Sequence, residues 1–165
     1  MSLHRDLLDQ ARHLVNREPR RPKQASLRRA ISTAYYALYH LLVAEATRVL
    51  VRKAELRNRF ARAFEHANLK SASRAFANPQ PNQLPNLTGG APIPPDLEVV
   101  ANAVIDLQEA RHEADYNVGQ RFGRLEASNL IAQAEAAFQA WQRVRTNPIS
   151  HNYLAALLLW KLWNR

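Results

Sequence analysis

The sequence LRRAISTAYYALYH, residues 27–40, decides the fold. Its apolar residues recur at helical spacing, and this spacing continues to about Lys53. The aliphatic positions are Leu27, Ile31, Ala34, Leu38, Leu41 and Leu42, and the other face carries Tyr35, Tyr36, Tyr39 and Val43. A helix that is apolar or aromatic nearly all round is typical of the buried centre of a helical protein. The stretch therefore predicts a long central helix from about Ser26 to Lys53.

Helical periodicity also covers most of the remaining chain. Further helices are predicted over residues 3–17, 55–77, 125–145 and 150–163, and another is predicted to begin at residue 96. Residues 78–95 are rich in proline and asparagine, include two adjacent glycines and carry no charge, which predicts one long loop without helix. Strand-like alternation is absent. We therefore predict a single all-α domain over residues 1–165, an up-and-down bundle of about five to six helices.

Composition excludes several classes of chemistry. The 165 residues include no cysteine and four glycines, so disulfides, thiolate zinc sites, thiol catalysis and glycine-rich phosphate loops are not expected. The six histidines are scattered and show no metal-binding spacing, so we expect neither a metal nor a cofactor. No signal peptide and no apolar run long enough to span a membrane are present, which predicts a cytoplasmic protein.

The net charge of +9 is concentrated in the first half of the chain. Residues 1–77 contain 16 Lys and Arg against 6 Asp and Glu, and most of these basic residues are arginine. Arginine favours forked contacts to phosphate. This bias indicates a polyanionic partner, with RNA or DNA first and membrane lipid second. The alternative is an arginine-rich composition that reflects only a GC-rich genome.

An arginine and an aspartate interrupt the apolar stripe of the helix that begins at Asp96. The stripe continues past Leu107 to Arg111, Ala114 and Asp115, so a guanidinium and a carboxylate take positions that aliphatic side chains fill in the preceding turns. Four residues apart, they can meet on one face of the helix. The pair is either a functional site or a buried ion pair that fixes the helix register.

Two segments resemble the HEPN family of helical bundles. Residues 27–40 resemble the second-helix signature R-A-Y-Y-A-x-F-H, and RHEADYN, residues 111–117, resembles the segment R-x-x-A-D-Y. The two segments cover about 21 residues in the expected order, and the helix pattern extends the likeness over residues 1–146. The resemblance implies a bundle of four or five helices that forms a homodimer. Many members are metal-independent ribonucleases with an R-x4-6-H motif, whereas others pair with a small nucleotidyltransferase in toxin–antitoxin systems or bind nucleotides.

The ribonuclease motif is incomplete in this chain. Arg111 and the polar His112 match its start, but Tyr116, Asn117 and Val118 stand where its final histidine would fall. A substitute base is His66, which a helix over residues 55–77 would place on one face with Arg59, Arg62 and Lys70. The alternative for this face is a solvated basic surface. The candidate catalytic residues are Arg111, Asp115, Tyr116, His66 and Arg62, and the candidate nucleic-acid contacts are Arg57, Arg59, Lys70 and His112.

Three function hypotheses follow from these residues and from the resemblance. The first is an RNA-binding or nucleotide-binding HEPN-like protein that acts as a metal-independent ribonuclease in a toxin or defence system. The second is a non-enzymatic HEPN module partnered with a nucleotidyltransferase, and the third is a purely structural dimer.

Two apolar features also have more than one interpretation. The tyrosines of the central helix either pack in the core or stack on bases, and His40 beside them is expected to be a core histidine. The apolar terminal helix, at about residues 150–163, packs on the bundle or in a dimer interface, with a membrane-surface role as the alternative.

Overall fold

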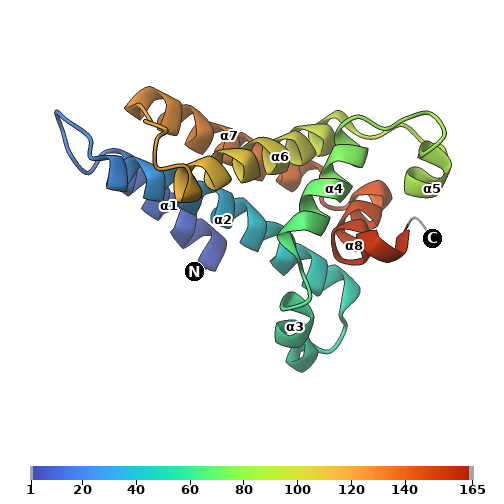
Figure 1. The fold of residues 1–165 in the computed structure, drawn as a ribbon. Helices are drawn as coiled ribbons and strands as arrows, with labels where there is room; N and C mark the ends of the chain where they lie inside the picture. Colours follow the sequence, from blue (N-terminus) through green and yellow to red (C-terminus); the bar gives the residue numbers. More distant parts are fainter. Residues whose placement is uncertain (1, 164–165) are drawn as a thin grey trace.

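The structure, a computed structural model, describes residues 2–163. Within this range it contains eight helices and no strand, which confirms the all-α prediction (Figure 1). The helices are α1 (Leu3–Val15), α2 (Gln24–Leu50), α3 (Ala54–Ala61), α4 (His66–Ala77), α5 (Leu84–Thr88), α6 (Pro95–Tyr116), α7 (Arg124–Val144) and α8 (Pro148–Trp163). The predicted count of five to six helices is wrong, because two further helices arise within residues 55–95.

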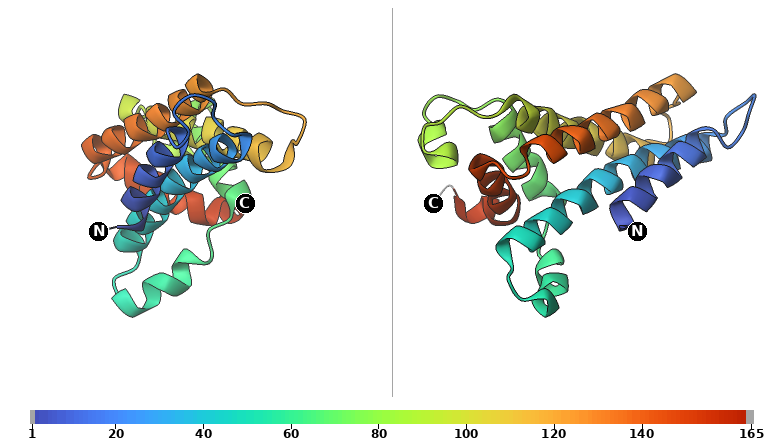
Figure 2. Two further views of the ribbon diagram at one scale, coloured as in Figure 1. Left: turned by 90° about the vertical axis from the view of Figure 1, so that its left-hand side faces the viewer. Right: turned by 180° about the vertical axis from the view of Figure 1, so that it is seen from behind.

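Four long helices form the body of the protein. Helices α1, α2, α6 and α7 alternate in direction along the chain (Figures 1 and 2). Each of the four packs closely on the other three, except that α1 does not pack closely on α6. Helices α3 to α5 are inserted between α2 and α6, and α4 and α8 pack together beside the C-terminal half of α2. This order brings the start of α2 beside the end of α6, and the end of α2 beside the end of α7.

The prediction of a buried central helix is confirmed by α2. Residues on all of its sides are buried, among them Leu27, Ile31, Tyr35, Leu38 and Leu42. Burying an aliphatic side chain of this size contributes about 1.5–3 kcal/mol. Because α1, α6, α7 and α8 all contact α2, its position determines where the other helices lie.

The predicted helix over residues 55–77 is wrong as a single element. The chain leaves helical geometry after Ala61 and resumes it at His66, so α3 and α4 are separate helices. Phe64 in the link is buried in the core, whereas α3 has no buried residue and projects from the body (Figure 1). Burial of Phe64 thus accompanies the turn that separates the two helices. Arg59 and Arg62 therefore do not share a helical face with the residues of α4.

The predicted loop over residues 78–95 contains a short helix, α5. Pro85 lies in the first turn of α5, where a helix does not need the missing N–H. Leu87 is buried and anchors the segment. Gly89 ends α5 with a φ of 70°, a left-handed conformation that glycine adopts without a steric penalty. Proline content alone therefore did not exclude a helix here.

Helix α8 divides into a buried part and an exposed part. Tyr153, Leu154 and Leu157 are buried on the bundle. The backbone at Leu159 is non-helical, and beyond it Leu162 is exposed. Among residues 2–163, no helix combines the length and the apolar character that crossing a membrane requires.

Candidate functional site

Aromatic, imidazole and guanidinium groups from three helices meet beside the middle of α2. We call Tyr35, Tyr36, Tyr39, His66 and Arg111 the Tyr–His–Arg cluster. The hydroxyl of Tyr35 is 2.6 Å from Nδ1 of His66, the first residue of α4. The ring of Tyr39 lies 4.7 Å from the His66 ring, and its hydroxyl donates to the carbonyl of Phe64 at 3.3 Å. The tyrosines thus fix both the imidazole and the backbone that precedes it.

Arg111 enters the cluster from α6. Its Nη2 donates to the Tyr36 hydroxyl at 3.1 Å, and its Nε lies 3.1 Å from Oδ2 of Asp115. The guanidinium carbon also lies 5.7 Å and 5.4 Å from the ring centroids of Tyr35 and Tyr36, within the range of cation–π attraction. Asp115 in turn accepts a hydrogen bond from Ser32 at 3.3 Å. The arginine side chain is only 15% exposed, so its charge acts with little screening by water.

The environment lowers the pKa of His66. Burial of the imidazole is the largest cause, followed by the positive charge of Arg111 and by His40. His66 is therefore neutral at pH 7 and can accept a proton. Burial raises the pKa of Tyr35, so its hydroxyl keeps its proton beside the imidazole. Burial alone would lower the pKa of Arg111, but the interactions with Tyr36 and Asp115 outweigh burial and raise this pKa.

One buried polar atom beside the cluster has no partner. In the described part of the chain, Gln108 Oε1 is buried without a hydrogen-bond partner, whereas Arg111 Nε, although it forms no hydrogen bond of good geometry, is ion-paired with Asp115 at 3.1 Å. Gln108 Nε2 donates to the backbone carbonyl of His66 at 3.0 Å, so its unpaired oxygen lies in the same region. A buried unpaired polar group costs about 1–3 kcal/mol. A group of this kind calls for a specific explanation, and a ligand that donates a hydrogen bond to it would supply one.

The last turn of α6 places two further candidate residues at the rim of the cluster. Tyr116 is 64% exposed, and its ring centroid lies 5.9 Å from the Arg111 guanidinium. The ring of His112 is exposed, and its centroid lies 5.1 Å from the centroid of the Tyr116 ring. Both side chains can contact a ligand that approaches Arg111 from solvent.

The other candidate residues lie away from Arg111. Arg62 follows α3 and is exposed, and no side-chain hydrogen bond or ion pair joins it to the cluster within residues 2–163. Arg59 is exposed on α3, and Lys70 pairs with Glu109 at 3.0 Å. Arg57 packs back on the chain through a hydrogen bond from its Nε to the carbonyl of Val51. Of the residues expected beside His66, the structure therefore keeps only Lys70 on the same helix, one turn away, and places Arg59 and Arg62 on α3 or at its end.

Sequence reasoning missed Gln108 and Ser32 as parts of this site. Gln108 precedes Arg111 by three residues, which places the two side chains on one face of α6. That spacing was a usable signal. Ser32 lies one helical turn before Tyr36 on α2, but its contact with Asp115 depends on how α2 and α6 pack. No spacing within one segment could have shown that contact.

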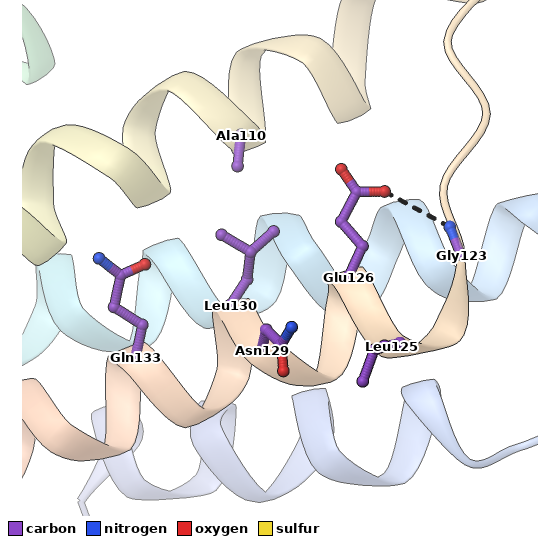
Figure 3. Close-up of a pocket in the computed structure, with 7 residues that line it drawn as sticks. All are labelled: Ala110, Gly123, Leu125, Glu126, Asn129, Leu130 and Gln133. Carbon is purple, nitrogen blue, oxygen red and sulfur yellow. Dashed lines mark hydrogen bonds between the residues drawn. The ribbon is translucent and has the colours of Figure 1, made fainter.

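A larger groove lies elsewhere in the structure. It has a volume of about 610 Å³ and runs between α6 and α7, lined by Ala110, Gly123, Leu125, Glu126, Asn129, Leu130 and Gln133. Figure 3 shows Leu130, Gln133 and Glu126 extending from α7 towards α6. Its one ionisable side chain, Glu126, faces the backbone N–H of Gly123 at 3.5 Å. The Tyr–His–Arg cluster carries much more acid–base and anion-binding chemistry, and we take the cluster as the candidate site.

Comparison of the chain with family models, with curated proteins and with solved structures finds no match. Among residues 2–163, no group of three or more His, Cys, Asp or Glu side chains is arranged to hold a metal ion.

Proposed function

We propose that the protein is a HEPN-like RNA-binding protein that cleaves RNA without a metal at the Tyr–His–Arg cluster. The observation that carries the proposal is a neutral, half-buried imidazole, His66, held by the Tyr35 hydroxyl in the field of the Arg111 guanidinium. RNA cleavage of this kind needs a base for the 2′-hydroxyl proton and a cation for the charge that develops on the phosphate. The cluster offers one of each.

The proposed reaction uses the RNA's own 2′-oxygen as nucleophile. In the tautomer that this step requires, Nδ1 of His66 carries the imidazole hydrogen and donates it to the Tyr35 oxygen 2.6 Å away, so the unprotonated Nε2 accepts the 2′-hydroxyl proton. The 2′-oxygen then bonds to phosphorus, a 2′,3′-cyclic phosphate forms, and the 5′-oxygen leaves with its bonding electron pair. Arg111 stabilises the charge on the phosphate oxygens. The leaving oxygen takes its proton from Tyr116 at the rim or from water.

The contacts between the two HEPN-like segments support this proposal. Residues 27–40 and 111–117 meet through Tyr36 and Arg111 and through Ser32 and Asp115. The side chain of Arg28 also donates to the carbonyl of Ala114 at 2.9 Å. In the same proposal the protein acts in the cytoplasm as a homodimer, in a toxin or defence system.

One observation favours the non-enzymatic module as a second candidate. Arg111 already contacts Tyr36 and Asp115, so part of its hydrogen-bonding capacity is used within the chain. Such an arginine can hold α2 against α6 without acting on a substrate. In that role the protein binds a partner such as a nucleotidyltransferase, and His66 is dispensable.

Single-turnover cleavage of labelled RNA in EDTA separates the two candidates. We expect His66→Ala to slow cleavage by about 100-fold or more, the typical contribution of a general base. His13→Ala is the matched control, because His13 is exposed on α1 and far along the chain from the cluster. Thermal melts of both variants show that each is folded. Cleavage by His66→Ala at the parent rate would refute the catalytic role, and no cleavage by the parent would favour the binding module.

A further inference from the structure

A second groove opens beside the Tyr–His–Arg cluster, between the start of α1, the middle of α2 and the projecting α3. Its volume is about 280 Å³. The polar residues that line it are His4, His40, Thr47, Arg57, Asn58 and Ser2, and Leu3, Val43, Ala44 and Ala61 form its apolar walls. Small-molecule sites span about 300–1,000 Å³, so this groove lies just below that range and can hold a phosphate group with part of its nucleotide.

The polar lining is suited to an anion. Arg57, His4, His40 and Asn58 all carry N–H donors, and no carboxylate lines the groove. The nearby Glu45 is bonded to Arg48, Arg145 and Trp141, and these contacts satisfy its charge within the protein. The groove therefore keeps a net positive charge from its guanidinium.

Arg57 is positioned for a ligand. Its Nε donates to the carbonyl of Val51 at 3.1 Å, which fixes the guanidinium at the edge of the groove. This is its one side-chain hydrogen bond within residues 2–163, and its terminal nitrogens form no ion pair there. Two parallel N–H donors of an arginine match the oxygens of a phosphate group.

His40 connects this groove to the candidate site. Its ring packs against Tyr39 at 5.1 Å, and the Tyr39 ring packs against His66 at 4.7 Å. One aromatic side chain thus separates the groove from the proposed general base. Burial lowers the pKa of both His40 and His4, which favours a neutral imidazole at pH 7, and Nε2 of His4 lies 3.1 Å from the Ser2 hydroxyl oxygen. A strand bound at His66 would reach the groove with its neighbouring nucleotide.

We infer that this groove is a phosphate-binding subsite for single-stranded RNA, in which Arg57 holds the phosphate next to the one cleaved at His66. The inference rests on the proposed function, because it assigns the groove to the same strand. The apolar walls of Leu3 and Val43 contact the sugar or base, and the donors of Arg57 and Asn58 bind the phosphate. The groove thereby sets which way the strand crosses the cluster.

The test is binding of a short, fluorescently labelled oligonucleotide whose sugars are 2′-deoxy at every position, so that cleavage cannot occur. Fluorescence anisotropy is measured in EDTA at one fixed salt concentration. We expect Arg57→Gln to weaken binding by about tenfold or more, as loss of a charge-assisted contact predicts. The control is Arg59→Gln, which removes the same charge from an exposed position of α3 and should weaken binding by less than about threefold.

A second pair of variants tests the groove without removing the arginine. Ala61→Glu places a carboxylate in the lining and should weaken binding by about tenfold or more, whereas Ala54→Glu adds the same charge at an exposed position of α3. Equal losses within each pair, or saturable binding of inorganic phosphate without binding of the oligonucleotide, would overturn the subsite. Arg57-dependent binding together with absent cleavage of RNA would leave the subsite standing and refute the catalytic proposal alone.

Discussion

Glu45 joins the ends of α2 and α7 through a set of contacts that makes a quantitative prediction. Its carboxylate accepts hydrogen bonds from Trp141 Nε1 at 3.0 Å, from Arg145 at 2.9 and 3.1 Å, and from Arg48 at 3.1 and 3.3 Å. The Glu45 side chain is 11% exposed, and Trp141 is fully buried. Removing the carboxylate therefore leaves a buried indole N–H without a partner.

We expect Glu45→Ala to lower the free energy of unfolding by about 3 kcal/mol. The orphaned Trp141 N–H accounts for about 1–3 kcal/mol of this loss. The contribution of the two arginines is smaller, about 1 kcal/mol or less for each, because both retain access to water when the carboxylate is removed. For a chain of this size each kcal/mol shifts the melting temperature by about 2–4 °C, so the variant should melt about 6–12 °C lower.

The same contacts fix the sign of the pH dependence. Burial alone would raise the pKa of Glu45, but the hydrogen bonds from Arg48 and Trp141 outweigh burial and hold this pKa below 4.5, its usual value. A carboxylate with a depressed folded-state pKa stabilises the fold above its unfolded pKa and loses that contribution as the pH falls through the folded value. The difference in stability between parent and Glu45→Ala should therefore shrink below about pH 4.5.

Thermal unfolding followed by circular dichroism, from pH 7 down to pH 3, measures both effects. Glu109→Ala is the control, because Glu109 forms exposed pairs with Lys70 and Arg74 and should change stability by less than about 0.5 kcal/mol. A loss in Glu45→Ala as small as that of the control would refute the reasoning. A difference that stays constant down to pH 3 would show that ionisation of Glu45 contributes nothing.

Three further predictions concern other contacts. Arg111→Met should raise the pKa of His66, because the substitution removes a positive charge that lowers this pKa. Arg111→Lys keeps the charge and should leave the pKa of His66 low, and an NMR titration of the imidazole in each variant measures the pKa. Tyr153→Phe removes the 2.8 Å contact with the buried Ser73 hydroxyl and should destabilise the fold by about 1–2 kcal/mol in denaturant titration, part of which a second change, Ser73→Ala, should restore. Arg28→Met removes the donor to backbone carbonyls at the end of α6 and in the loop that follows it, and should speed amide hydrogen exchange in that loop without affecting α7; unchanged exchange would contradict this role.

The central helix was predictable from sequence because periodicity is a local property. Residues 24–50 are apolar on nearly every side, so only a buried position satisfies them. The break between α3 and α4 was not predictable in this way, because no proline or glycine marks residues 62–65. There the chain turns so that Phe64 reaches the core, and this gain depends on helices that lie elsewhere in the sequence.

The candidate site shows the same division between local and long-range information. Helical spacing within residues 55–77 grouped His66 with Arg59 and Arg62, and that grouping is wrong because the break after Ala61 separates them. What places His66 is its contact with Tyr35, a residue 31 positions earlier in the chain. Residues 27–40 and 111–117, which lie far apart in the sequence, also meet at this site. The hydroxyl of Tyr36 lies 3.1 Å from Nη2 of Arg111, and because this contact exists only through the packing of α2 on α6, no spacing within either segment could have predicted it.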